Sequence, residues 1–338
     1  MSTSDAEVII FCQAPAKIPM ALACYEESRK LGRSVAIIAI NAVLVYEFIK
    51  SLKLDLVSLT YCPCHFVWAK NPVRLYKSFL LVWQQAKELG VFEWHDKIIY
   101  FSCISCDQQT HAFVWWLRKR NRIVYMYNVV DESVRLVPCA TFVNYIKLAL
   151  LRIFFGGVQF VWHSVDGKYS QGLRKDAFEN WHPSDLKGVL SKYARKVTCG
   201  RERKCAIFFS NPYRDPYTTE ESYIDCHIAV AKRLKDLGYW IVGKGHPRLG
   251  VLKELDDFTD EKIPDYLPAE FLDLDGVSLC VGLTSTSICA TACKGLASYS
   301  FLPLLETRDQ EAVGYWHEYL KLNSNGKIQY INTIDFNM

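Results

Sequence analysis

The sequence predicts an α/β fold in two domains, each built on a mostly parallel β-sheet. Short apolar segments rich in β-branched residues, such as residues 35–40, alternate with longer segments whose apolar residues recur at helical spacing. This alternation runs through residues 1–165, breaks at a polar and charged stretch over residues 166–203, and resumes over residues 204–338. The break indicates an interdomain connection between an N-terminal and a C-terminal domain.

The N-terminal domain begins with a β-α-β pattern. Residues 8–11 are a short apolar run, a helix passes through residues 25–31 and stops at Gly32, and residues 35–40 are apolar throughout. Such continuous apolar strands are typical of a parallel sheet covered on both faces. Further strands are expected at residues 97–102, 123–128 and 158–162, further helices at 68–89, 109–120 and 144–155, and a short helix and strand within 48–57.

The C-terminal domain repeats the alternation. A strand at residues 204–210 is followed by a helix at 218–237 and a second apolar strand at 239–242. The remaining expected strands are residues 277–281, 297–302 and 327–331, with a helix opening after Gly282 and another at 310–322. Polar residues follow several of these strands, and in an open α/β sheet the carboxyl ends of the strands are where ligands bind.

Bulk composition excludes several classes of protein. The chain has 338 residues, 50% hydrophobic and 22% charged, which is enough for two cores of roughly 150 residues each. Its net charge of +4 suits an anionic ligand, but the dense basic stripe of a nucleic-acid-binding protein is absent. The glycine motifs of dinucleotide enzymes and P-loop NTPases are absent from the sequence, as is the Gly-x-Ser-x-Gly motif of α/β-hydrolases.

The N-terminus lacks the basic region of a signal peptide, so we expect the protein to start in the cytosol. Charged residues and glycines interrupt the apolar tract at residues 143–162, which favours a core or interfacial helix over a spanning one. The thirteen cysteines are expected to be reduced, mostly as core residues. The alternative is redox or zinc chemistry at Cys103 and Cys106, or in the Cys62 to His65 cluster.

The clearest candidate site follows the strand at residues 239–242. His246 lies between the basic residues Lys244 and Arg248 and is followed directly by Pro247. Because a proline restricts the residue before it to extended conformations, the imidazole should have a fixed direction. A histidine in this position can donate a proton or a hydrogen bond to a leaving phosphate, or it can simply cap a tight turn.

Hydroxyl side chains open the helix after the strand at residues 277–281. They belong to Thr284, Ser285, Thr286 and Ser287. The N–H groups of a helix start favour an anion such as phosphate, although these side chains can also serve as ordinary helix caps. Glu270, in the preceding loop, can accept hydrogen bonds from ribose hydroxyls, or it can lie exposed on a helix.

Two acidic residues, Asp131 and Glu132, follow the strand at residues 123–128. A carboxylate beside another in a closed cleft has a raised pKa, which suits a general base. The alternative is a solvated turn or a helix N-cap. Asp273 and Asp275 match the Asp-x-Asp pattern of metal-dependent glycosyltransferases, but they precede a strand rather than end one, so no metal is expected there.

Together these motifs resemble those of bacterial sialyltransferases of the GT-B type, in particular glycosyltransferase families 52 and 38. Those families carry an acidic pair followed by glycine, then a His-Pro motif, then a Ser/Thr-rich helix start. The matching segments here are residues 131–133, 246–247 and 284–287, and residues 268–270 resemble the Pro-x-Glu segment of family 52. The resemblance covers roughly residues 125–304 and implies two Rossmann-like domains facing across a cleft.

The resemblance also implies a role for each residue. Asp131, with Glu132 beside it, would deprotonate the acceptor hydroxyl, and His246 would protonate or stabilise the departing CMP phosphate. The residues implied in nucleotide binding are Ser285, Thr286, Ser287, Thr284, Glu270, Pro247, Lys244, Ser210 and Asn211. The hydroxyls at the helix start would hold the phosphate, so that no metal or other cofactor is required.

The implied reaction is an inverting transfer of sialic acid from CMP-sialic acid to a sugar of a surface glycan, such as lipooligosaccharide or capsule polysaccharide. Because such acceptors are often lipid-linked, we expect a cytoplasmic protein that associates peripherally with the inner membrane through residues 144–155. Ser133 replaces the glycine of the family. This departure favours one alternative, a GT-B-like module that binds a nucleotide without catalysis. The other alternative is a transferase that uses CMP-Kdo or CDP-glycerol, since such enzymes share the His-Pro and hydroxyl motifs.

Overall fold

The computed structural model describes residues 3–63, 65, 72–102, 108–126, 160–165, 168–173, 178–200, 203–213, 218–246, 249–307 and 309–337. The chain divides into two compact units, Met1–Val189 and Leu190–Met338. This division falls inside the stretch at residues 166–203 that the sequence indicates as the interdomain connection.

The first unit is built on a six-stranded parallel sheet with the strand order β3-β2-β1-β4-β5-β8. Its strands are β1 (Val8–Cys12), β2 (Val35–Ile40), β3 (Ser58–Cys62), β4 (Ile98–Phe101), β5 (Arg122–Met126) and β8 (Glu179–Trp181). Its helices are α1 (Ile18–Lys30), α2 (Val43–Ser51), α3 (Pro72–Glu88) and α4 (Gln108–Leu117). The strand order reverses between β1 and β4, as in a Rossmann-like sheet.

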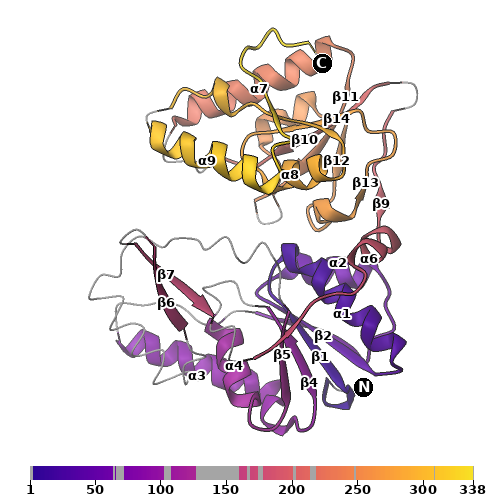
Figure 1. The fold of residues 1–338 in the computed structure, drawn as a ribbon, viewed down its shortest axis with the longest axis vertical. Helices are drawn as coiled ribbons and strands as arrows, with labels where there is room; N and C mark the ends of the chain where they lie inside the picture. The colour runs from indigo at the N-terminus through magenta and orange to yellow at the C-terminus, as the bar shows by residue number, and fades with distance from the viewer. Residues whose placement is uncertain are drawn as a thin grey trace. The chain divides into compact units, whose positions relative to one another are not determined.

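Both faces of this sheet are covered. Every residue of β1 and β2 is buried, which is why these strands read as continuous apolar runs. Phe11 lies on the face covered by α3 and α4 and packs against Trp94 and Phe113, with ring centroids 6.4 and 6.0 Å apart. Helices α1 and α2 lie on the other side of the sheet (Figure 1).

The second unit repeats this architecture. Its six-stranded parallel sheet has the order β12-β11-β10-β14-β15-β16. The strands are β10 (Cys205–Ser210), β11 (Trp240–Gly245), β12 (Glu261–Ile263), β14 (Leu279–Gly282), β15 (Ala297–Ser300) and β16 (Gln329–Tyr330). The helices are α7 (Glu220–Asp236), α8 (Thr286–Cys293) and α9 (Gln310–Asn323). Here the strand order reverses between β10 and β14, which makes the carboxyl ends of these two strands the expected ligand site.

Shorter elements complete the described chain. They are β6 (Phe160–Val165), β7 (Lys168–Leu173), α6 (Leu186–Lys192), β9 (Arg195–Lys196) and β13 (Leu272–Asp273). β6 pairs with β7 in an antiparallel hairpin, and β9 pairs with β13. The short strand expected within residues 48–57 is instead β3, which begins at Ser58. The prediction missed it because β3 is a largely half-exposed edge strand, whose mixed polar and apolar residues do not form an apolar run.

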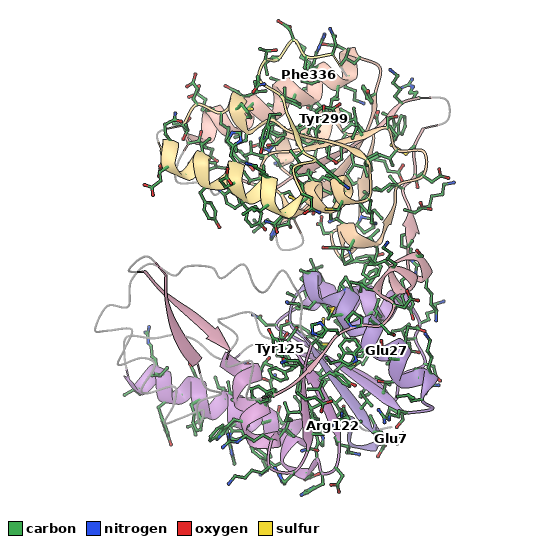
Figure 2. The ribbon with its side chains drawn as sticks, viewed as in Figure 1. Glu7, Glu27, Arg122, Tyr125, Tyr299 and Phe336 are labelled. Atoms are coloured by element: carbon green, nitrogen blue, oxygen red, sulfur yellow. A yellow bond between two sulfur atoms is a disulfide. The ribbon has the colours of Figure 1, made fainter. Side chains whose placement is uncertain are left out.

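Part of the stretch predicted as a connection belongs to the first sheet. β8 pairs with β5, and the Glu179 carboxylate forms an ion pair with the Arg122 guanidinium. Glu27 of α1 accepts hydrogen bonds from the Trp181 indole N–H, at 3.1 Å, and from the Ser184 amide, at 2.8 Å. Figure 2 labels Glu27 and Arg122, the two residues that bind this segment. The polar residues after position 178 therefore pair with charges on other elements, and the first unit extends beyond residue 165.

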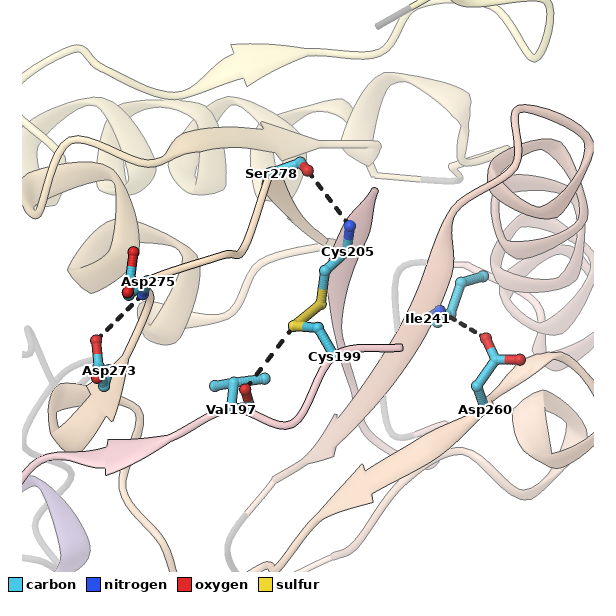
Figure 3. Close-up of a disulfide and its surroundings, with 8 residues drawn as sticks. All are labelled: Val197, Cys199, Cys205, Ile241, Asp260, Asp273, Asp275 and Ser278. Carbon is cyan, nitrogen blue, oxygen red and sulfur yellow. Dashed lines mark hydrogen bonds between the residues drawn. A yellow bond between two sulfur atoms is a disulfide. The ribbon is translucent and has the colours of Figure 1, made fainter. Parts of the chain in front are cut away.

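One pair of cysteines differs from the expectation that all are reduced. Cys199 and Cys205 form a disulfide, with their Cα atoms 5.8 Å apart (Figure 3). This Cα separation lies within the range that a disulfide requires. Cys205 begins β10, and its amide donates to the Ser278 hydroxyl at 3.3 Å. The buried free cysteines are Cys12, Cys24, Cys62, Cys226, Cys280 and Cys289, which confirms the core role expected for them.

Within the described residues, no helix combines the length and the apolar character needed to cross a lipid bilayer. The apolar tract at residues 144–155, on which the membrane hypothesis rests, lies outside the described residues.

Candidate functional site

The carboxyl ends of three neighbouring strands meet at one edge of the second sheet. Ser210 at the end of β10 pairs with Gly245 at the end of β11, and Phe209 pairs with Gly282 at the end of β14. The parallel register therefore brings the segments that follow, beginning at Asn211, His246 and Leu283, to the same edge. This edge adjoins the reversal of strand order between β10 and β14.

The main chain of His246 is held on both sides while its side chain is exposed. Its amide donates to the carbonyl oxygens of Ser210, at 3.1 Å, and Gly250, at 3.0 Å. Its own carbonyl accepts from the amides of Leu249, at 3.0 Å, and Gly250, at 2.9 Å. The hydrogen bonds that join His246 to Leu249 and Gly250, called the His246 turn below, thus fix the backbone that carries the imidazole. Pro247, the expected cause of a fixed direction, lies outside the described residues.

Gly245 allows this turn to approach the strand. A Cβ atom at position 245 would lie 2.3 Å from the Gly250 carbonyl carbon and 2.5 Å from the Val251 amide nitrogen. Both are backbone atoms, so a side chain cannot be accommodated by a rotamer change. Glycine at position 245 is therefore a requirement of the site and not only of the strand.

Replacing Gly245 with alanine should lower the free energy of unfolding by about 2 kcal/mol or more, at the upper part of the range for overpacking, because the turn must shift. Urea denaturation measures this change. Gly314→Ala is the matched control, since Gly314 lies in α9, its φ is not left-handed, and a Cβ added there would meet nothing within 4 Å. That control should stabilise the protein slightly. Equal stability of Gly245→Ala and the unsubstituted protein would show that the turn is free to move.

The hydroxyl residues do lie at a helix start. Ser285 is the N-cap of α8, and its side chain accepts a hydrogen bond from the Ser287 amide at 3.2 Å. The capping alternative is therefore confirmed for Ser285. Thr286 is exposed, whereas Thr284 and Ser287 are half-buried. A helix start can also stabilise an anion through the helix dipole, and that role of α8 stays a prediction.

Lys244 lies inside the protein rather than at its surface. It is 2% exposed, and its ammonium donates to the carbonyl oxygens of Gly245, at 2.8 Å, and Asp265, at 3.4 Å. Burial lowers the pKa of this ammonium to about 8, with the carboxylates of Asp265 and Glu270 acting against the shift. Lys244 thus braces the end of β11, and a contact with a nucleotide stays a prediction.

Glu270 lies in the short 3-10 helix Ala269–Phe271 and is half-buried. Burial raises the pKa of its carboxyl group, while its own main-chain amide and the ammonium groups of Lys294 and Lys244 act in the opposite direction. The exposed alternative is therefore wrong for this residue. A carboxylate on which two ammonium groups act is suited to accept hydrogen bonds from hydroxyl groups.

Lys294 is a residue of this region that the sequence reasoning missed. It is the C-cap of α8, and its ammonium donates to the main-chain carbonyls of Glu270, at 2.8 Å, and Leu272, at 2.9 Å. It thereby links the end of α8 to the segment that carries Glu270. A lysine at the end of a helix is a common local signal, but its partners are 24 and 22 residues away in the sequence.

Ser210 and Asn211 have structural partners of their own. The Ser210 hydroxyl accepts from the Leu252 amide at 3.2 Å, and the Asn211 carbonyl accepts from the Tyr223 hydroxyl at 3.0 Å. Next to Tyr223, His227 is buried, and its Nδ1 lies 2.7 Å from the Tyr223 carbonyl oxygen. Burial lowers the pKa of His227 to about 4, so this histidine is neutral at pH 7. It contacts Tyr223, which in turn holds the Asn211 main chain.

The acidic pair, Asp131 and Glu132, lies outside the described residues. At the corresponding edge of the first sheet, the structure shows a buried polar network that sequence reasoning missed. The Ser102 hydroxyl after β4 donates to the Gln13 side chain after β1 at 3.1 Å, and Gln13 donates to Thr110 at 3.2 Å. These three residues bridge the point where the strand order reverses.

The Asp-x-Asp pair forms a local turn. The Asp273 carboxylate accepts a hydrogen bond from the Asp275 amide at 3.1 Å (Figure 3). In the part of the chain that the structure describes, no group of three or more His, Cys, Asp or Glu residues is placed to hold a metal ion.

Comparison with known proteins adds a family and a fold. The model of the family "Alpha-2,8-polysialyltransferase" matches residues 165–293, less than half of the chain. This match includes His246, Glu270 and the start of α8. A search of curated proteins found no significant match.

Among solved structures, the chain is similar to the GT-B domain of a sialyltransferase from Photobacterium damselae, with 13% identity and a TM-score of 0.50. That alignment covers 96% of this chain and 99% of the other. The glycosyltransferase UGT89C1 of Arabidopsis thaliana is similar at 12% identity, with a TM-score of 0.47 and coverage of 98% and 86%. A putative UDP-N-acetylglucosamine 2-epimerase of Listeria monocytogenes has 12% identity, a TM-score of 0.45, and coverage of 92% and 81%.

The Photobacterium damselae domain shows the GT-B fold, which confirms the predicted architecture of two Rossmann-like sheets. The family match adds the relation to sialyltransferases that residues 246–247 and 284–287 predict. The chain is therefore a sialyltransferase-like glycosyltransferase with the GT-B fold.

Proposed function

We propose that this glycosyltransferase moves sialic acid from CMP-sialic acid to a sugar hydroxyl of a surface glycan, lipooligosaccharide or capsule polysaccharide, with inversion and without a metal. The observation that supports this most directly is the convergence of His246 and the start of α8 on one edge of the second sheet. A polysialyltransferase family match over the same residues supports the choice of sugar.

On the donor side, the phosphate of CMP leaves as a dianion and needs stabilisation. The start of α8 offers N–H groups, the hydroxyls of Thr286 and Ser287 and the positive end of the helix dipole. His246 reaches outward from a backbone held by hydrogen bonds and supplies a proton or a strong hydrogen bond to the leaving oxygen. These groups neutralise developing charge without a metal ion.

The nucleoside would bind beside these groups. Glu270 would accept hydrogen bonds from the ribose. Lys294 donates to the main-chain carbonyl of Glu270, and the charge of Lys244 acts on its carboxyl group. Thr284, Ser210, Asn211 and Pro247 belong to the same proposed nucleotide site, from the segments that end β14, β10 and β11.

On the acceptor side, we propose Asp131 as the base that removes the proton of the acceptor hydroxyl, with Glu132 raising its pKa. The proposal rests on the position of the pair after β5, whose end is next to β4 and its polar network in the first sheet. A cytoplasmic location, where nucleotide sugars are made, belongs to the same proposal.

Donor binding tests this function most sharply. In ligand-observed NMR with the full chain, CMP-sialic acid should give saturation transfer, and CMP should compete with it. CMP-Kdo and CDP-glycerol should neither bind comparably nor be hydrolysed. Donor binding should be the same in the presence of EDTA. The rate of transfer to a glycan acceptor should also be unchanged by EDTA.

Other outcomes would identify the alternatives. Binding of CMP-Kdo or CDP-glycerol with no response to CMP-sialic acid would replace the donor. CMP binding without hydrolysis or transfer of any of these donors would indicate a nucleotide-binding module. Activity lost in EDTA and restored by magnesium or manganese would return Asp273 and Asp275 to consideration as metal ligands.

A further inference from the structure

Helix α3 carries the largest group of exposed apolar side chains in the described part of the chain. They are Val73, Tyr76, Leu80, Leu81 and Trp83, each between 41% and 59% exposed. No other described helix carries more than two large apolar residues with comparable exposure. Apolar surface gathered in this way marks a binding surface more often than scattered apolar residues do.

The spacing of these residues makes a continuous stripe. Val73, Tyr76, Leu80 and Trp83 are separated by three or four positions, so they lie along one side of the helix over about 15 Å. The side facing the sheet is occupied by other residues, among them Val82 and Ala86, which are fully buried in the core. These buried residues pack α3 against the sheet, and the stripe lies on a different side of the helix.

Cations accompany the stripe. Arg74, Lys77 and Lys87 are exposed on α3, against the single carboxylate of Glu88. The Lys87 ammonium lies 6.0 Å from the centroid of the Trp83 ring. Lysine and arginine beside aliphatic and aromatic residues on one helix are typical of helices that lie on a membrane surface.

Half-buried aromatic residues connect the exposed side of α3 to α4. The Trp83 ring lies 6.0 Å from Phe92, and Phe92 lies 5.2 Å from Trp116 of α4, measured between ring centroids. Arg118 and Lys119, just past the end of α4, are both exposed. Tryptophan and tyrosine favour the interface between lipid and water, while cations favour anionic headgroups.

We propose that this outward face of α3 docks on an anionic lipid surface. Val73, Leu80 and Leu81 have no groups that could hydrogen-bond a glycan. A two-fold contact with a second copy would bring Arg74, Lys77 and Lys87 of one copy close to the same cations of the other. Repulsion between like charges disfavours such a contact. An anionic bilayer satisfies both the apolar stripe and the cations. This surface is independent of the donor site.

Vesicle sedimentation with the full chain tests the proposal. The protein should pellet with vesicles of phosphatidylcholine mixed with phosphatidylglycerol, and much less with phosphatidylcholine alone or in high salt. Val73→Ser combined with Leu80→Ser should lower the partition coefficient by roughly 10-fold or more, because two apolar side chains no longer leave water. Lys77→Gln should lower it about 5-fold.

Leu31→Ser combined with Leu322→Ser is the matched control, since both leucines are more exposed than those of α3 and lie elsewhere. It should sediment like the unsubstituted protein, and both double variants should keep their circular dichroism and their transfer to a soluble acceptor. Failure of the unsubstituted protein to bind anionic vesicles would overturn the proposal, as would an equal loss in the control. If the unsubstituted protein forms a dimer without lipid and the α3 double variant does not, the stripe binds a second copy instead. If a soluble anionic glycan displaces the protein from vesicles, the stripe binds a glycan instead.

Discussion

Replacing His246 with alanine is expected to lower donor hydrolysis and sialyl transfer by roughly 10²-fold or more. The backbone of this residue is held by hydrogen bonds to Ser210, Leu249 and Gly250 that do not involve the side chain. The substitution therefore removes the imidazole without releasing the turn. Because the imidazole acts on the leaving phosphate as charge develops, kcat should fall more than the donor KM rises.

His182 provides the matched control, since it is also exposed and also precedes a proline. It lies in the first unit, between β8 and α6, far in sequence from His246. His182→Ala should transfer sialic acid at the rate of the unsubstituted enzyme. Turnover of His246→Ala close to that rate would instead make His246 a structural turn residue.

Replacing Asp131 with asparagine is expected to lower transfer by about 10²- to 10⁴-fold, the range attributed to general acid–base catalysis. Asparagine retains the size of the side chain but cannot take the proton of the acceptor hydroxyl. Binding of CMP-sialic acid should be unchanged, because the proposed donor groups belong to the second unit. Steady-state transfer kinetics and ligand-observed NMR measure the two properties separately.

Glu132→Gln distinguishes the two carboxylates of the pair. If Asp131 is the base, Glu132→Gln should have the smaller effect and should move the acidic limb of the pH profile to lower pH, because the neighbouring negative charge that raises the Asp131 pKa is removed. A larger loss in Glu132→Gln would transfer the role of base to Glu132. Transfer by Asp131→Asn at the unsubstituted rate would exclude this mechanism.

Much of the second unit could be predicted from local sequence. The strand expected at residues 204–210 is observed at Cys205–Ser210, and the helix expected at 310–322 is observed at Gln310–Asn323. Both have strong signals, an unbroken apolar run in one case and an N-cap at Asp309 in the other. The edge strands β3 and β8 were misplaced or missed because half-exposed strands lack such a run.

The positions of His246 and the hydroxyl residues could be predicted in the same way, while their roles stay predictions. The order of His246 and the hydroxyl residues after two strands was enough to expect them at one edge, since parallel strands end together. Lys294 and the network of Gln13, Ser102 and Thr110 could not be found in this way. Their hydrogen bonds join residues that are distant in the sequence, and no local pattern encodes such a pair.

The sequence by itself determined the α/β alternation, the two sheets and the chemical groups that follow their strands, because strand period and helix period are local properties. Only the tertiary structure decided how those groups are used. It buried Lys244, made Ser285 a helix cap, left His246 exposed and joined Cys199 to Cys205. Burial and hydrogen bonding depend on which distant segments pack together, and that is decided by the fold as a whole.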